Sequence, residues 1–132
     1  MSLTYLDTSA LVKLVVAEPE SDALASWLDE RAHDLLCTSV IGKVELLCAA
    51  RRRGPQTLAA ATTMVAELAL VPADAIVLEL AATIDPAGLR TLDALHLASA
   101  AGLGADLAHL VAYDTALVAS AETLGLHPVS PR

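Results

Sequence analysis

The sequence has no phenylalanine, one tryptophan and two cysteines among its 132 residues. Two cysteines can form no more than a single disulfide, which excludes a disulfide scaffold. We expect Cys37 and Cys48, which have apolar neighbours, to be buried thiols in a reducing compartment. Hydrophobic residues nevertheless make up 55% of the chain, so the protein is not disordered. Alanine, leucine and β-branched residues must therefore build its core.

Long apolar runs are also missing. No segment reaches the roughly 20 apolar residues that a membrane-spanning helix needs. The first residues carry neither the basic segment nor the cleavage site of a signal peptide. We therefore expect a cytoplasmic protein without membrane contact, folded as a single domain over residues 1–132.

Positive charge is scarce, with 8 Lys and Arg against 16 Asp and Glu and a net charge of −8. A protein that binds nucleic acid passively needs a basic stripe, so this class is disfavoured. The acidic balance permits an enzyme whose carboxylates hold cations, or a protein with a basic partner. The basic run Arg51–Arg53 fits either phosphate contact or compensation of a helix dipole.

Short apolar segments alternate with segments of helical periodicity along the whole chain. This alternation predicts an α/β fold, a three-layer α/β/α sandwich with a mostly parallel central sheet. The turn signal at 85–88 predicts a loop, and Thr91 is a candidate N-cap for the helix that follows. Strands are predicted at 3–7, 35–39, 70–72, 107–113 and 126–129, and helices at 8–16, 20–32, 40–53, 56–68, 74–83, 91–101 and 115–124.

Acidic residues that interrupt apolar segments are the candidates for function, because a buried carboxylate is costly without a partner. Asp7 and Asp114 each end a predicted strand. The carboxyl ends of parallel strands share one edge of a sheet, where ligands bind, so these two residues can meet. Glu45 and Asp93 lie on predicted helices among apolar neighbours.

Each of these acids also has a purely structural interpretation. Asp7 and Asp114 could cap the helices that follow them, and Asp93 could complement a helix dipole. Glu45 could occupy an exposed helix face. Glu67 and Glu79 have apolar neighbours as well, and periodicity alone does not choose four of these six acids.

Converging carboxylates would define a site for a hard cation. They raise one another's pKa unless a cation neutralises them. Mg²⁺ or Mn²⁺ fits such oxygen ligands, and no His/Cys cluster with zinc spacing exists in the sequence. A site of this kind can activate water for displacement at a phosphodiester.

Four segments together resemble the PIN-domain family, specifically its VapC-type toxin nucleases. The resemblance spans nearly the whole chain, in order and at suitable spacing, and the third segment, with the sequence RTLDALHLASA, is the most specific. The segments cover residues 5–14, 38–46, 90–100 and 111–117.

The resemblance implies a PIN-like α/β/α sandwich with an Mg²⁺-dependent site, which Mn²⁺ could also occupy, for single-stranded RNA. It implies an endoribonuclease that cleaves RNA by metal-activated water, forms a homodimer and is neutralised by a cognate antitoxin. Ser9, and more weakly Thr8, would hydrogen-bond and orient the site. The implied catalytic residues and metal ligands are Asp7, Glu45, Asp93 and Asp114.

Two positions depart from the family pattern. Ala112 stands where many relatives have Thr or Ser, and Cys48 where many have Arg. These departures leave open a catalytically weak PIN scaffold that acts only through partner binding. A phosphoacceptor aspartate at Asp7 is a further alternative, but such folds need a lysine after a late strand and no lysine follows Asp93.

The remaining polar residues receive structural interpretations. His96 follows Asp93 by three residues, but the family needs no histidine base or ligand there, so we assign it neither function. We expect Lys13 and Lys43 to be solvated rather than in contact with phosphate.

Overall fold

A computed structural model of the protein describes residues 2–84 and 89–132. Residue 1 and the loop predicted at 85–88 lie outside the described residues. Within the described part of the chain, no helix is both long and apolar enough to cross a membrane.

The centre of the fold is a five-stranded sheet in the order β3-β2-β1-β4-β5, and each pair of neighbouring strands is parallel. This confirms the predicted α/β class. The strand predicted at 3–7 ends one residue early and the strand predicted at 107–113 ends two residues early. The strand predicted at 126–129 begins two residues late. The strands are β1 (Leu3–Leu6), β2 (Leu35–Ser39), β3 (Ala69–Val71), β4 (Leu107–Val111) and β5 (Pro128–Val129).

Seven helices and a short 3₁₀ helix, Gly104–Asp106, connect the strands in the described residues. The prediction that Thr91 caps a helix is wrong. Thr91 is the first helical residue and Arg90 occupies the cap position without a side-chain hydrogen bond. The helices are α1 (Thr8–Val15), α2 (Ser21–Asp29), α3 (Val40–Arg53), α4 (Pro55–Ala66), α5 (Ala75–Thr83), α6 (Thr91–Ala101) and α7 (Thr115–Thr123).

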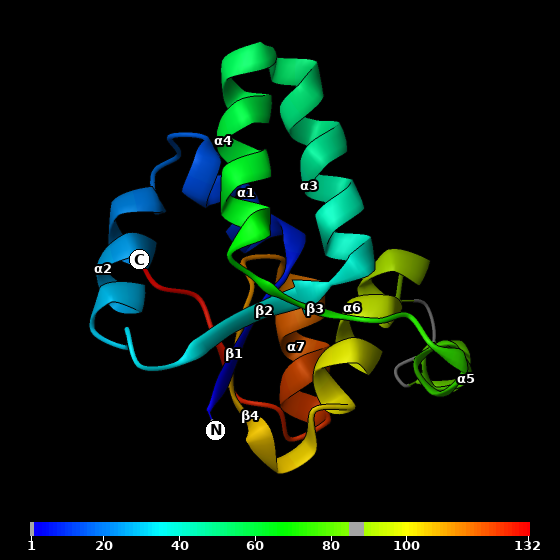
Figure 1. Cartoon of the computed structure of the whole chain (residues 1–132). Helices are drawn as coiled ribbons and strands as arrows, with labels where there is room; N and C mark the ends of the chain where they lie inside the picture. The colour runs from blue at the N-terminus through cyan, green and yellow to red at the C-terminus, as the bar shows by residue number, and fades with distance from the viewer. Residues whose placement is uncertain (1, 85–88) are drawn as a thin grey trace.

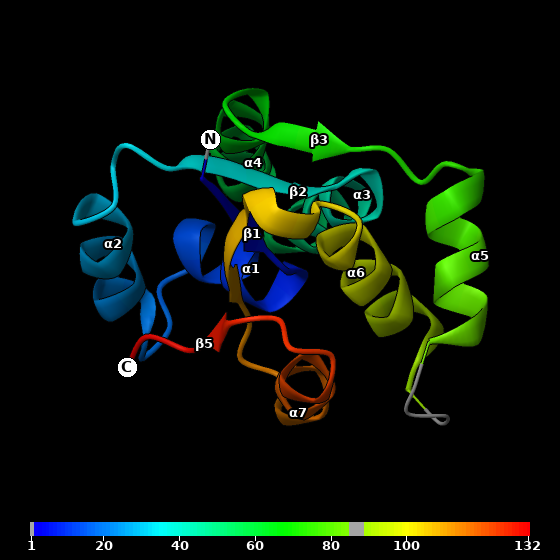
Figure 2. The same cartoon turned by 90° about the horizontal axis from the view of Figure 1, so that it is seen from below.

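Hydrophobic cores on the two faces of the sheet hold the layers together. Successive strand residues point to opposite faces, so Tyr5 joins the core beneath α6 and α7 while Leu6 joins the core beneath α1 and α2. Both side chains are fully buried. Figure 2 shows α1 and α2 on one side of the strands and α5 and α6 on the other.

Helices α3 and α4 run side by side and project beyond the sheet (Figure 1). The turn between them is a single residue, Gly54, with a φ of 121°, a left-handed conformation that favours glycine. Pro55 follows at the first helical position of α4, where its missing N–H is not needed.

Strand order places the candidate site. The chain goes from β1 to β2 on one side, whereas β4 pairs with the other side of β1. Ligands of open parallel sheets bind outside the carboxyl ends of strands where the strand order reverses. In this sheet the order reverses beside the end of β1, which is followed at once by Asp7.

Candidate active site

Asp7 lies at the end of β1 and caps helix α1. Its Oδ1 accepts hydrogen bonds from the Ala10 backbone N–H at 3.0 Å and from the Ser9 hydroxyl at 2.6 Å. The residue is only 4% exposed. The structural interpretation as a cap is therefore confirmed, but a cap does not need burial. A carboxylate kept out of water at a ligand-binding edge is typical of a functional group.

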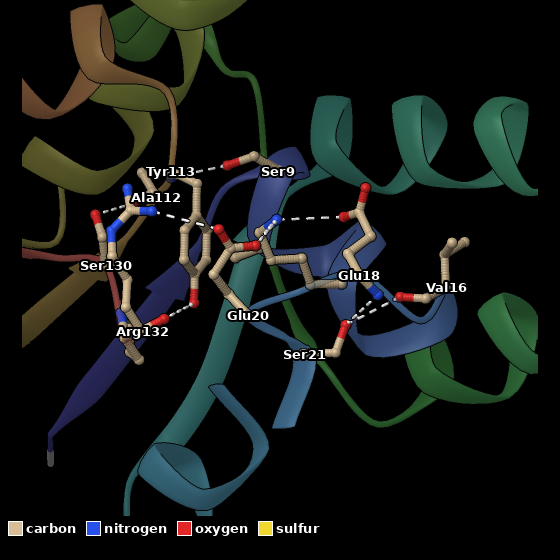
Figure 3. A network of polar contacts seen from close by, with 12 residues as sticks. Ser9, Val16, Glu18, Glu20, Ser21, Ala112, Tyr113, Ser130 and Arg132 are labelled. Carbon is tan, nitrogen blue, oxygen red and sulfur yellow. Dashed lines mark hydrogen bonds and ion pairs between the residues drawn. The ribbon is translucent and has the colours of Figure 1, made fainter. Parts of the chain in front are cut away.

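Ser9 connects Asp7 to the segment after β4. Its hydroxyl accepts a hydrogen bond from the Tyr113 backbone N–H at 3.0 Å while donating to Asp7. Figure 3 shows Ser9 next to Tyr113, in a network that continues into the last residues of the chain. The Tyr113 hydroxyl donates to the Pro131 carbonyl and the Ser130 hydroxyl donates to the Ala112 carbonyl.

Glu45 extends from α3 into a polar cluster and keeps 25% of its side chain exposed. Its Oε1 accepts a hydrogen bond from the Thr8 hydroxyl at 2.7 Å and lies 2.8 Å from His96 Nε2. Thr8 and His96 are themselves 3.0 Å apart, measured from Oγ1 to Nε2. Thr8, the weaker of the two predicted orienting residues, thus contacts one predicted acid and Ser9 another.

Asp114 and Asp93 complete the set from α7 and α6. Asp114 caps α7, since its Oδ1 accepts the Leu117 backbone N–H at 2.9 Å. Asp93 lies in the first turn of α6 and is partly buried. Both structural interpretations, a cap and a residue beside a helix N-terminus, are confirmed for these acids as well.

The charges of these residues influence one another. Burial, and to a smaller extent the Asp93 charge, raises the pKa of Asp7, although the hydrogen bonds from Ser9 and Ala10 work against this rise. Burial and the neighbouring Asp114 raise the pKa of Asp93, with Glu45 adding to the effect. Asp93 is therefore close enough to Asp7 to oppose its ionisation, and Asp114 and Glu45 are close enough to oppose that of Asp93.

Glu45 behaves in the opposite way. Burial alone would raise its pKa, but the hydrogen bonds from His96 and Thr8 outweigh burial and lower the pKa. Glu45 consequently stays ionised more readily than an ordinary glutamate. Its carboxylate is held by a hydroxyl and an imidazole rather than by a lysine or arginine.

The donor set suits a hard divalent cation in its chemistry. Carboxylate oxygens are the ligands that Mg²⁺ and Mn²⁺ prefer. A cation would offset the burial, and the smaller repulsion between acids, that raise the pKa of Asp7 and Asp93. The acidic side chains do not converge on a single ion position. Among the described residues, no group of three or more His, Cys, Asp or Glu is spaced to hold a metal ion.

Three further residues make contacts that the sequence did not predict. His96, to which we assigned no function, lies inside the cluster, and Tyr5 lies behind it. Tyr5, Glu45 and His96 are far apart in the sequence, so their spacing does not indicate that they contact one another. Lys13 is not solvated: its side chain is 11% exposed and its Nζ pairs with Glu20 at 2.9 Å and Glu18 at 3.3 Å.

The two remaining acids differ from the two cysteines in their exposure to solvent. Glu67 and Glu79 are both exposed to solvent. Cys37 is buried and Cys48 partly buried, and both are free thiols. Burial raises the pKa of Cys37 to about 12.

Ala112 is fully buried and offers no hydroxyl to Asp114. Its backbone is held instead, since its N–H donates to the Val129 carbonyl at 3.1 Å and its carbonyl accepts from Ser130. The segment leading to Asp114 is thus fixed by β5 and the residues after it.

The parallel sheet, its helical layers and the acids at its carboxyl edge define an α/β/α protein of PIN type. Comparison with known proteins agrees with this class. The sequence matches the PIN domain over residues 4–124. The chain therefore belongs to the PIN-domain family.

Its relatives by sequence are ribonucleases by name. The chain is 46% identical over 131 residues to Ribonuclease VapC35 of Mycobacterium tuberculosis, covering 98% of this chain and 97% of that protein. It is 42% identical to Ribonuclease VapC46 of the same organism, covering 99% of each chain.

Solved structures share the fold at lower sequence identity. Mycobacterium tuberculosis VapC20, described as a Sarcin-Ricin loop cleaving toxin, aligns with a TM-score of 0.75 and 19% identity over 97% of this chain and 99% of that chain. VapBC2 of Rickettsia felis, bound to a DNA fragment from its promoter, aligns with a TM-score of 0.76 and 18% identity over 98% and 99% of the two chains. At these identities the structures establish the fold.

Proposed function

We propose that this protein is an Mg²⁺-dependent endoribonuclease toxin that hydrolyses RNA phosphodiester bonds and is neutralised by a cognate antitoxin. The observation that carries the proposal is the placement of Asp7, Glu45, Asp93 and Asp114 around the carboxyl ends of β1 and β4. The sequence relatives named ribonucleases support it over almost the full length of the chain.

The chain's own residues would divide the work. Asp7, Asp93 and Asp114 would hold the cation, and Glu45 would join them with its charge already oriented by Thr8 and His96. Mn²⁺ could take the same place. When bound, the cation would supply Lewis-acid stabilisation of the charge that develops at the phosphate. In the hydrolysis, water forms a bond to phosphorus while the bond from phosphorus to a ribose oxygen breaks.

Partner binding follows the same chemistry. An acidic site that opposes its own ionisation favours a positively charged group from a protein inhibitor, and an arginine can bind a carboxylate in a bidentate manner. VapBC structures among those that share the fold support an antitoxin as this partner. We also propose a homodimer in the cytoplasm, where the two free thiols would remain reduced.

The test is cleavage of RNA by the purified protein, free of antitoxin. The protein is incubated with total cellular RNA in Mg²⁺, in Mn²⁺ and in EDTA, beside the Asp93→Asn variant. We expect discrete fragments that require both a divalent cation and Asp93. Cleavage that persists in EDTA would reject metal dependence.

The alternative is a PIN scaffold that acts only through partner binding. The absence of a preformed ion-binding arrangement among the described acids favours testing it. Intact RNA in every condition, from protein that is folded and verified to be free of antitoxin, would favour this alternative over the ribonuclease.

A further inference from the structure

The imidazole of His96 lies between the core and the acidic site. The residue is 2% exposed, and both ring nitrogens have partners. Nδ1 lies 2.7 Å from the Tyr5 hydroxyl, and Nε2 lies 2.8 Å from Glu45 Oε1. One ring therefore connects a buried residue of β1 to an acid on α3.

The protons in this chain of contacts can be assigned from the donors. The Tyr5 hydroxyl accepts the Ser39 backbone N–H at 3.2 Å, and burial raises the pKa of Tyr5, so the phenol keeps its proton. That proton points to Nδ1 of His96 across 2.7 Å. Nδ1 is then an acceptor, and the ring proton must be on Nε2, from which it is donated to Glu45.

The ring is held in place by close packing as well as by hydrogen bonds. A side-chain carbon at Gly42 of α3 would lie 3.2 Å from His96 Cε1 and would collide with the Thr38 hydroxyl. Thr38 is itself occupied, because it donates to the Leu6 carbonyl at 2.7 Å. The Tyr5 and His96 rings meet edge to face at 5.8 Å. The imidazole consequently has little freedom to turn.

Glu45 receives two donors on the same oxygen. Oε1 accepts from Thr8 and lies within hydrogen-bonding distance of His96 Nε2, while Oε2 takes part in neither contact. A glutamate on a helix is otherwise a long side chain with several rotamers of similar energy. Two donors on Oε1 fix the carboxylate and leave Oε2 to act toward a cation or substrate.

We propose that His96 is a positioning residue for Glu45, whose carboxylate it holds through Nε2 while the Tyr5 hydroxyl holds Nδ1. The proposal rests on the proposed ribonuclease function, since it assigns His96 to the orientation of one acid of that site. His96 itself touches neither the reacting phosphate nor the cation in this assignment. A core histidine that merely satisfies its hydrogen bonds would stabilise the fold without directing Glu45.

A matched pair of variants separates these two possibilities. His96→Gln places an amide N–H roughly where Nε2 lies, whereas His96→Asn is too short to reach Glu45 but can still accept from Tyr5. Both variants lose the ring packing. We expect His96→Asn to cleave RNA about 10-fold to 100-fold more slowly than the wild type, and His96→Gln to recover most of that loss. We also expect His96→Asn to need more Mn²⁺ for half-maximal cleavage.

The control is His127→Gln, the same chemical change at an exposed histidine, which we expect to leave cleavage unchanged. Thermal unfolding of all variants shows whether a slower rate follows from loss of fold. If His96→Gln and His96→Asn cleave at the same rate per folded molecule, His96 has no positioning action on Glu45 and the proposal is overturned.

A second measurement does not depend on catalysis. Two-bond ¹H–¹⁵N spectra of the wild-type protein identify which ring nitrogen of each histidine carries a proton. We expect Nε2 of His96 to carry a proton, which it donates to Glu45. A ring with its proton on Nδ1 alone would overturn the proposal. Failure of the wild type to cleave RNA would instead count against the proposed function, and the spectra would still decide the tautomer.

Discussion

Two segments of this chain share a local sequence, Asp-Thr at the start of a helix that follows a strand, yet they meet different surroundings. Asp7 and Asp114 cap α1 and α7 in the same way, with Oδ1 accepting the backbone N–H three residues on. Asp7 is buried, however, and Asp114 is partly exposed. Thr8 is hydrogen-bonded to Glu45, whereas Thr115 is exposed.

The difference shows that the cap is a local property and the active-site environment is not. Any aspartate before a helix can accept the N–H of the third helical residue, because only neighbouring backbone is involved. Burial and hydroxyl partners depend on what packs over the cap. Helix α1 packs against α3, which brings Glu45 toward Thr8, whereas Thr115 of α7 faces solvent.

The largest effect is expected at the first aspartate. Asp7→Asn keeps a good capping residue, so the free energy of unfolding should change little or rise, while RNA cleavage should fall at least about 100-fold because the buried charge is lost. Asp114→Asn is the matched variant and should cost less activity. Rates at saturating Mg²⁺, measured beside urea unfolding, check both; equal losses would remove the distinction between the two segments.

A smaller loss is expected at the first threonine. Thr8→Val removes the hydroxyl that donates to Glu45 while conserving the shape of the side chain, and we expect cleavage to fall about 10-fold. Thr115→Val makes the same change in the other segment, where the side chain is exposed, and should leave the rate within experimental error. Initial rates on one RNA substrate compare the pair. A similar loss in both variants would mean that the contact with Glu45 is not the cause.

The residue that follows the first threonine, Ser9, is expected to affect stability, whereas the residue that follows the second, Ala116, is not. Ser9→Ala leaves the Tyr113 backbone N–H without its acceptor and Asp7 without a donor, and we expect it to lower the free energy of unfolding by about 1 to 3 kcal/mol. Ala116→Ser adds the missing hydroxyl to the second segment. Because Ala116 is exposed, its effect should stay within about 0.5 kcal/mol. Urea titrations give both values. If Ser9→Ala leaves the free energy of unfolding unchanged, the Tyr113 backbone N–H has found another acceptor.

The smallest effect is a dependence on pH. Because the pKa of Asp7 is raised in the folded state, the folded protein retains a proton that the unfolded chain releases above its ordinary value of 3.8. The free energy of unfolding should therefore decrease as the pH rises from 3.8 through the raised pKa. The pKa of Asp93 is raised too, with the same sign.

Thermal unfolding between acidic and neutral pH, without a divalent cation, measures this dependence. Asp7→Asn should reduce the decrease without abolishing it, since Asp93 still contributes. Mg²⁺ added at neutral pH should restore stability in the wild type by favouring the ionised acids, and should restore less in Asp7→Asn. A decrease of the same size in both proteins would show that Asp7 does not contribute.

Much of the fold could be predicted from the sequence, because each element depends mainly on local periodicity and on its end signals. The predicted 35–39 strand and the 40–53 helix agree with β2 and α3 at both ends. The errors lie where packing sets the ends. The strand predicted at 107–113 stops at Val111. The Ala112 N–H still donates to Val129 of β5, but the Tyr113 N–H donates to the Ser9 hydroxyl instead of to a strand.

The acids of the site were also visible in the sequence, since a carboxylate among apolar residues is conspicuous wherever it lies. Their partners were not. Ser9 is two residues from Asp7 in the sequence, so its hydrogen bond to Asp7 could be predicted. Lys13 was interpreted as solvated, although Glu18 and Glu20 lie within seven residues of it, because a helix pattern does not show how the chain turns after Val16.

By itself the sequence determined the order of strands and helices along the chain, because that order follows from residue type and short-range spacing. It also showed six acids among apolar neighbours, of which the resemblance to the PIN-domain family selected four. Only the tertiary structure decided which donors those acids meet. The contact of His96 with Glu45 spans 51 residues and that with Tyr5 spans 91. No periodicity extends that far. The packing of α3 and α6 against β2 and against each other, with β2 paired to β1, brings the three side chains together.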